Sequence, residues 1–290
     1  MRVCLMIEGQ EGVTWDQWRA LATTAEAAGF DALFRSDHYM SLDDVPGHGS
    51  LDAWGTINAL AALTSTIRLG TLVSPATFRH PSTLAREVVT ADHVSNGRVE
   101  LGLGAGWHEG EHAAFGFPFD STKERFDRLA EQMEIVHRSW TEGPFDFRGR
   151  HYTLQHADAL PKPVQDPHPP LIAGGAAKPR GVALAAKWAD EYNTVYATVE
   201  ECRERRERIV AACAEAGRDP IRFSVMTGFA IDGDPADHHP ASIVGSIEEM
   251  AKQLKALEDA GVDGVMLQFL QHDDLETVEL IGRELIPAVS

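Results

Sequence analysis

The feature that most constrains the fold is an alternation, along the whole chain, of short apolar β-branched runs with longer stretches of helical periodicity. Short apolar runs bounded by turn residues predict buried strands, and the stretches between them predict crossover helices. The predicted strands cover 3–7, 31–35, 67–73, 98–103, 171–173, 191–195, 221–231 and 262–269, and the predicted helices cover 14–28, 53–64, 81–94, 121–140, 179–188, 198–216, 246–260 and 274–286.

This pattern favours an α/β fold of the (β/α)8-barrel type, in which each of eight strands is followed by a helix. An open doubly wound sheet gives the same alternation and is the alternative. Eight units fit a chain of 290 residues, and none of the runs is typical of a sheet edge. We therefore predict a single barrel domain over 1–290.

The alternation weakens between the fourth helix and the fifth strand. The segment 145–154 predicts a small hairpin that turns at 148–150, and the proline-rich segment 160–170 excludes regular structure. The βα pattern resumes directly afterwards. We expect an insertion region after the fourth βα unit, an excursion from the barrel at about 142–170.

Composition and charge disfavour several function classes. The net charge of −18, without a stripe of Lys and Arg, disfavours nucleic acid and anionic membrane surfaces as partners. No apolar run approaches the roughly 18 residues that cross a bilayer, and 1–12 lacks the basic region of a signal peptide. Three cysteines without paired spacing are typical of reduced core residues. We expect a cytoplasmic protein that acts on a small molecule.

In a barrel, the active site lies at the carboxyl ends of the strands. The second strand is followed by Ser36, Asp37, His38 and Tyr39. Histidine transfers protons near neutral pH, and a neighbouring carboxylate can orient its ring or raise its pKa. A solvated turn is the alternative interpretation. The loop 74–81 after the third strand is stiffened by two prolines and could support a planar ligand, or it is simply a stiff barrel loop.

Glycine-rich turns follow the fourth and fifth strands. The turn 102–109 permits close backbone approach, but Trp107 replaces the third glycine of a dinucleotide fingerprint. The turn 173–180 opens a helix with a proline and two cations, which suits a phosphate; a plain connection is the alternative.

The stretch from His108 to His112 also matches a zinc-protease pattern, two histidines four residues apart with a glutamate between them. Gly110 inside the motif and the lack of an evident third ligand count against zinc. We predict no metal site.

Taken together, several of these segments resemble the luciferase-like monooxygenase superfamily, and especially its branch that uses coenzyme F420. The resemblance covers nearly the whole chain and rests on the order and spacing of 36–38, 69–75, Arg86, 96–107 and 172–175. It implies a (β/α)8 barrel with an insertion region, a homodimer, and an isoalloxazine-like ring that lies across the strand ends.

The resemblance also implies roles for individual residues. Val73 and Ser74 would back the ring, in many relatives through a non-prolyl cis peptide or a bulge. Asp37 and His38 would lie near its reactive edge, with His38 as the acid/base group and Glu109 as the second candidate. The remaining cofactor-binding residues would be Gly104, Ala105 and Gly106 along the ring or ribityl chain, and Ala173, Gly174, Gly175 and Ala176 at the phosphate.

The function implied first is an F420-dependent oxidoreductase that transfers a hydride between the deazaflavin and a small organic substrate. Asp37, His38 and Tyr39 favour F420, since FMN-using members more often have Glu-His-His there. An FMN-dependent monooxygenase that consumes oxygen and needs a separate reductase is the alternative. A non-enzymatic flavin or deazaflavin carrier is the third, because a fold alone does not fix function.

Overall fold

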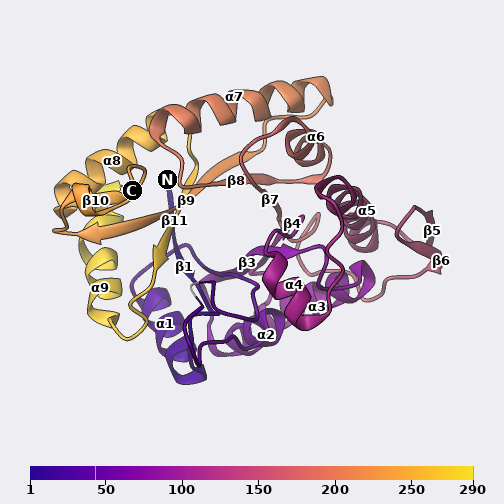
Figure 1. Cartoon of the computed structure of the whole chain (residues 1–290), viewed down its shortest axis with the longest axis horizontal. Coiled ribbons are helices and arrows are strands. Elements are labelled where there is room, and N and C mark those ends of the chain that lie inside the picture. The colour runs from indigo at the N-terminus through magenta and orange to yellow at the C-terminus, as the bar shows by residue number, and fades with distance from the viewer. Residues whose placement is uncertain (43, 290) are drawn as a thin grey trace.

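The structure is a computed structural model that describes residues 1–42 and 44–289, and they form a closed parallel β-barrel with helices around it (Figure 1). The barrel strands are β1 (Arg2–Ile7), β2 (Ala32–Arg35), β3 (Arg68–Pro75), β4 (Val99–Gly104), β7 (Leu171–Gly174), β8 (Glu191–Val195), β9 (Arg222–Ile231) and β11 (Gly264–Phe269). The longer helices are α1 (Trp15–Ala27), α2 (Ala53–Leu63), α3 (Pro81–Ser95), α5 (Thr122–Thr141), α6 (Pro179–Trp188), α7 (Val199–Glu215) and α8 (Ile247–Asp259).

Strand pairing closes the ring. β1 pairs with both β2 and β11, β4 pairs directly with β7, and β9 joins β8 to β11, all in parallel. Each of the eight barrel strands therefore has two neighbours, which an open sheet does not allow. The predicted barrel is confirmed, and the doubly wound alternative is wrong.

The predicted insertion is confirmed as an antiparallel hairpin of β5 (Phe145–Arg148) and β6 (Thr153–Ala157) that projects beyond α5 (Figure 1). Three short elements of the described residues were not predicted: the helix α4 (Glu109–Phe115), a 3-10 turn (Pro235–Asp237), and the strand β10 (Ile243–Gly245) that pairs with the end of β9. All three are too short to show a periodicity in sequence. The predicted last helix is divided into α9 (Leu275–Leu280), a π-helical turn (Ile281–Leu285) and α10 (Ile286–Val289).

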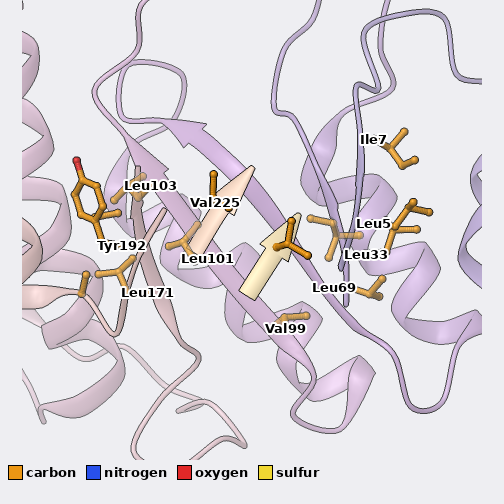
Figure 2. Close-up of a cluster of buried hydrophobic side chains, with 14 of the residues drawn as sticks. Leu5, Ile7, Leu33, Leu69, Val99, Leu101, Leu103, Leu171, Tyr192 and Val225 are labelled. Atoms are coloured by element: carbon orange, nitrogen blue, oxygen red, sulfur yellow. The ribbon is translucent and has the colours of Figure 1, made fainter. Parts of the chain in front are cut away.

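The alternation of side chains along each strand divides the core into two parts. One set packs outward against the helices, and Figure 2 shows part of it, including Leu5, Leu33, Leu69 and Leu101. The other set fills the inside of the barrel: Cys4, Met6, Ala32, Phe34, Ile172, Met226 and Met266, with Leu72 and Tyr196 packed against them.

Ion pairs close the amino-terminal end of the barrel. Arg2 lies 2.7 Å from Glu100 and 3.4 Å from Glu191, and both carboxylates are buried. A ligand that reaches the inside of the barrel therefore enters from the carboxyl ends of the strands. No helix within residues 1–42 and 44–289 combines the length and apolarity needed to cross a membrane.

Candidate active site

The centre of the candidate site is a hydrogen-bonded pair of side chains, His38 and Glu111. His38 follows β2, and its Nδ1 lies 2.7 Å from the Oε2 of Glu111 in α4. The other oxygen of Glu111 accepts from the backbone N–H of Tyr39 at 2.5 Å. The Glu111 side chain is fully buried, whereas 12% of the His38 side chain is exposed. The carboxylate thus fixes both the ring of His38 and the loop that carries it.

The protonation of Glu111 determines which nitrogen of His38 is free. Burial opposes ionisation of the carboxyl, but hydrogen bonds from His38 and from the backbone of Tyr39 and Met40 outweigh burial and lower the pKa of Glu111. An ionised carboxylate only accepts hydrogen bonds, so Nδ1 of His38 carries the proton that faces it. In the neutral imidazole, Nε2 then carries the lone pair that can accept a proton.

Asp37 is the centre of a second buried cluster. Its Oδ2 accepts from the hydroxyl of Ser74 and from the Nη1 of Arg79, both at 2.6 Å. Arg79 also lies 2.6 Å from Asp52, and the indole of Trp54 donates to Ser74 at 3.1 Å. The Oδ1 of Asp37 is buried and has no hydrogen-bond partner among the described residues.

Arg79 stabilises the buried carboxylate of Asp37. Only 8% of its side chain is exposed, and although burial disfavours its charge, the carboxylates of Asp37 and Asp52 and the phenol of Tyr39 raise its pKa. A buried carboxylate is tolerated when it is paired and hydrogen-bonded. One oxygen of Asp37 is thus anchored, and the other is buried without a partner among the described residues.

Glycines form a cradle around Val73 at the end of β3. The peptide bond between Leu72 and Val73 is cis, the feature that the resemblance implied. A Cβ on Gly104 would lie 2.6 Å from a methyl group of Val73, and one on Gly174 would lie 3.2 Å from the other methyl group. A side chain at Gly104 would therefore clash with Val73, and one at Gly174 would press tightly against it, so the predicted residues of three strand ends lie together.

The loop after β4 is fixed by α4 and α5. Gly106 has a φ of +79°, and a Cβ there would lie 2.8 Å from the hydroxyl of Thr77. That hydroxyl bonds the Nε2 of His112 at 2.7 Å, while the Nδ1 of His112 lies 2.7 Å from the carbonyl of His108. The two histidines of the zinc-like motif thus serve as a loop brace and a helix cap. Within 1–42 and 44–289, no three His, Cys, Asp or Glu residues are grouped as metal ligands.

The predicted phosphate turn lies at the end of β7. Ala173 is buried, Gly174 and Ala176 are exposed, and a Cβ on Gly175 would lie 3.1 Å from the hydroxyl of Tyr192. That hydroxyl accepts from the backbone N–H of Ala177 at 2.8 Å. Helix α6 begins directly afterwards without a side-chain cap. Of the two predicted cations, Arg180 is paired with Asp127, whereas Lys178 is exposed.

Two glutamates of α4 lie differently with respect to His38. Glu109, the predicted second acid/base group, is exposed in the first turn of the helix. Glu111, which sequence reasoning missed, is the carboxylate that contacts His38. The available signal was His108, whose side chain caps the helix by accepting from the N–H of Glu111. A helix that starts at this cap turns Glu111 toward β2.

The family model described as luciferase-like monooxygenase matches residues 3–238. The chain belongs to this family. Among its curated relatives is an F420-dependent hydroxymycolic acid dehydrogenase of Mycobacterium tuberculosis, 31% identical over 221 residues, which are 76% of this chain and 60% of that protein. An FMNH2-dependent dimethylsulfone monooxygenase of Pseudomonas putida is 24% identical over an alignment of 338 residues, covering 97% of this chain and 90% of that protein.

The luciferase-like fold is also found in a solved F420-dependent secondary alcohol dehydrogenase bound to an F420-acetone adduct. Its TM-score is 0.86 and its sequence identity 20%, with 100% of this chain and 99% of that chain covered. The chain spans less than two thirds of the length of several mycobacterial relatives that it matches. Relatives of this luciferase-like chain include oxidoreductases of two kinds, an F420-dependent dehydrogenase and an FMNH2-dependent monooxygenase.

Proposed function

We propose that this luciferase-like protein is an F420-dependent oxidoreductase that transfers a hydride between the deazaflavin and a small organic substrate. The observation that carries the proposal is the pair of His38 and Glu111 at the strand ends, which presents one nitrogen of His38 as a proton acceptor. The F420-dependent dehydrogenases among the relatives support it.

The residues at the barrel mouth fit a planar ring with a phosphorylated tail. Val73 packs between Gly104 and Gly174, and these ends of β3, β4 and β7 would lie behind the ring. The unpartnered Oδ1 of Asp37 offers one buried acceptor to a ring N–H. The uncapped start of α6, directly after the turn at 174–177, offers backbone N–H groups to a phosphate. When bound, F420 supplies two-electron hydride chemistry.

His38 would handle the proton that accompanies this chemistry. Its Nε2 accepts the proton from a substrate hydroxyl in one direction and returns it to a carbonyl oxygen in the other. Glu111 keeps the ring in the tautomer that allows this and stabilises the imidazolium that results. Trp107 packs edge-on against the ring of His38, with a distance of 5.8 Å between the ring centroids, and 62% of Trp107 is exposed. We propose that this indole shields the site from water.

The second candidate is an FMN-dependent monooxygenase that uses oxygen and a separate reductase. Its support is the match to the dimethylsulfone monooxygenase, which extends over 97% of this chain. The same cradle would accept the ring of FMN, because both cofactors have a fused three-ring system.

Anaerobic titration of the purified protein with F420, and separately with FMN, distinguishes the two by fluorescence. We expect tight binding of F420 and weak binding of FMN, and the opposite result would establish the second candidate. With a substrate found in a screen with F420, we expect the turnover of His38→Ala to be lower than that of the wild type by a factor of about 10²–10⁴, while its affinity for F420 is unchanged. Unchanged turnover would contradict the role of His38.

A further inference from the structure

The half of the barrel mouth formed by β8, β9, β11 and β1 carries a hydrogen-bonded array that the proposed chemistry does not use. The hydroxyl of Tyr196 donates to the side-chain oxygen of Gln268, whose amide donates to Glu8 at 2.7 Å. Gln10 donates to the other oxygen of Glu8 at 3.0 Å. The hydroxyl of Ser36, two residues before His38, donates in turn to Gln10. The array therefore extends to the loop after β2, which carries His38.

These side chains face the inside of the barrel. Glu8 follows Met6 by two residues and Gln268 follows Met266 by two, so they share the inward face of their strands. Tyr196 packs against the same interior cluster. A Cβ on Gly228 would lie 3.0 Å from the Tyr196 hydroxyl, so the glycine leaves the space through which this ring reaches Gln268.

The backbone of Tyr196 shows that its position is imposed by the surroundings. Its φ of +45° is in the left-handed region, which bulky residues seldom adopt. Such a conformation persists when the neighbouring structure holds it, and it is frequent at ligand-binding positions. Here it places a phenol above the barrel interior, beside the ring of His239 at a centroid distance of 4.9 Å.

The directions of the hydrogen bonds define what the array can still bind. All of its donors lead toward Glu8, an acceptor when ionised. Gln268 keeps a second N–H, and the oxygen of Tyr196, which already takes a hydrogen bond from the backbone of Gly228, keeps one further lone pair. Burial, together with the charge of Glu8, raises the pKa of Tyr196, which keeps the phenol protonated. One free donor beside one free acceptor is the complement of a hydroxyl group.

Charged residues are distributed unevenly between the two halves of the barrel mouth. The segments 8–14, 196–198, 232–242 and 270–274, which follow β1, β8, β9 and β11, contain no Lys or Arg and several acids. The cations Arg79, Lys178 and Arg180 follow β3 and β7 on the other half. An anionic ligand is repelled from a surface of negative potential. The acidic half thus disfavours a phosphate or carboxylate on the substrate.

We propose that Tyr196, Gln268 and Glu8 form the substrate-recognition site, which selects uncharged hydroxyl compounds over anionic ones. The inference rests on the proposed function, since it takes the other half of the mouth to hold the cofactor. Tyr196 and Gln268 contact the substrate hydroxyl, and Glu8 acts as a positioning residue that orients Gln268.

Saturation-transfer NMR with two size-matched probes, cyclohexanol and cyclohexanecarboxylate, tests this on the protein with and without F420. We expect cyclohexanol to bind and the carboxylate to bind at least about tenfold more weakly. Gln268→Leu and Tyr196→Phe should each weaken cyclohexanol binding about tenfold, as expected for one lost hydrogen bond. Gln271→Leu, an exposed glutamine three residues further on, is the control.

Three results would overturn the inference: no binding of cyclohexanol, equal or tighter binding of the carboxylate, or full affinity in both folded variants. Tyr196→Phe removes one oxygen atom only, so it keeps the test decisive if Gln268→Leu does not fold. Failure of the proposed function would instead show as an absence of F420 binding in the wild-type protein, which the NMR probes do not measure.

Discussion

Replacing Glu111 with glutamine should reverse the tautomer of His38 while it leaves the shape of the site unchanged. In the wild type, Nδ1 of His38 donates to the carboxylate over 2.7 Å. A glutamine amide group in the same place donates to Nδ1, so the ring proton moves to Nε2 and the acceptor is lost. The backbone N–H of Tyr39 can still bond the glutamine oxygen.

Two magnitudes follow for Glu111→Gln. Loss of a placed base costs about 10²–10⁴ in turnover, which corresponds to about 3–5 kcal/mol of transition-state stabilisation. Loss of one hydrogen bond to a charged group costs about 1.5–3 kcal/mol of folding free energy. Because the folded pKa of Glu111 is lowered, its contribution to stability is present above the unfolded pKa of about 4.3 and is lost as the pH falls through the folded value.

The assay combines turnover with F420, affinity for F420, and urea unfolding between pH 3 and pH 7. We expect a large loss of turnover, an unchanged F420 affinity, and a stability difference that shrinks as the pH falls below about 4. Nitrogen chemical shifts of His38 would report the tautomer directly. Glu276→Gln, in the exposed first turn of α9, is the matched control. Turnover within twofold of wild type in the folded Glu111→Gln protein would refute the reasoning, and a comparable loss in Glu109→Gln would assign the acid/base role to Glu109.

Three further predictions concern the surroundings of the site. Arg79→Met leaves Asp37 buried without its cation and should cost about 3–5 kcal/mol in urea unfolding; a second substitution, Asp37→Asn, should recover part of the loss, and additive losses would contradict the pairing. Gly104→Ala places a Cβ 2.6 Å from Val73, so F420 affinity should fall about tenfold at unchanged secondary structure; unchanged affinity would exclude this surface from the cofactor site. The three cysteines are buried, and burial raises the pKa of Cys202 to about 11, so a thiol reagent at pH 8 should modify them in urea and not in the native protein; rapid native modification would show that the core opens.

The alternation of strands and helices was readable from the sequence because burial on both faces of a parallel strand requires continuous apolar runs. Once a barrel was predicted, the location of the active site could also be predicted, because the carboxyl ends of all parallel strands lie on the same side of a barrel. Asp37 and His38 could be predicted there because they directly follow a strand. Similarly, the glycines at 104 and 174 were evident as positions of close approach, and the structure gives the reason in the methyl groups of Val73.

What the tertiary structure decided is which side chains meet. Glu111 reaches His38 across 73 positions of sequence, and Arg79 reaches Asp37 across 42. The array of Tyr196, Gln268 and Glu8 joins residues up to 260 positions apart. Local periodicity predicts the elements because it reflects contacts between near neighbours in sequence. Such long-range pairings exist only after the ring of strands closes, so no local pattern in the sequence specifies them.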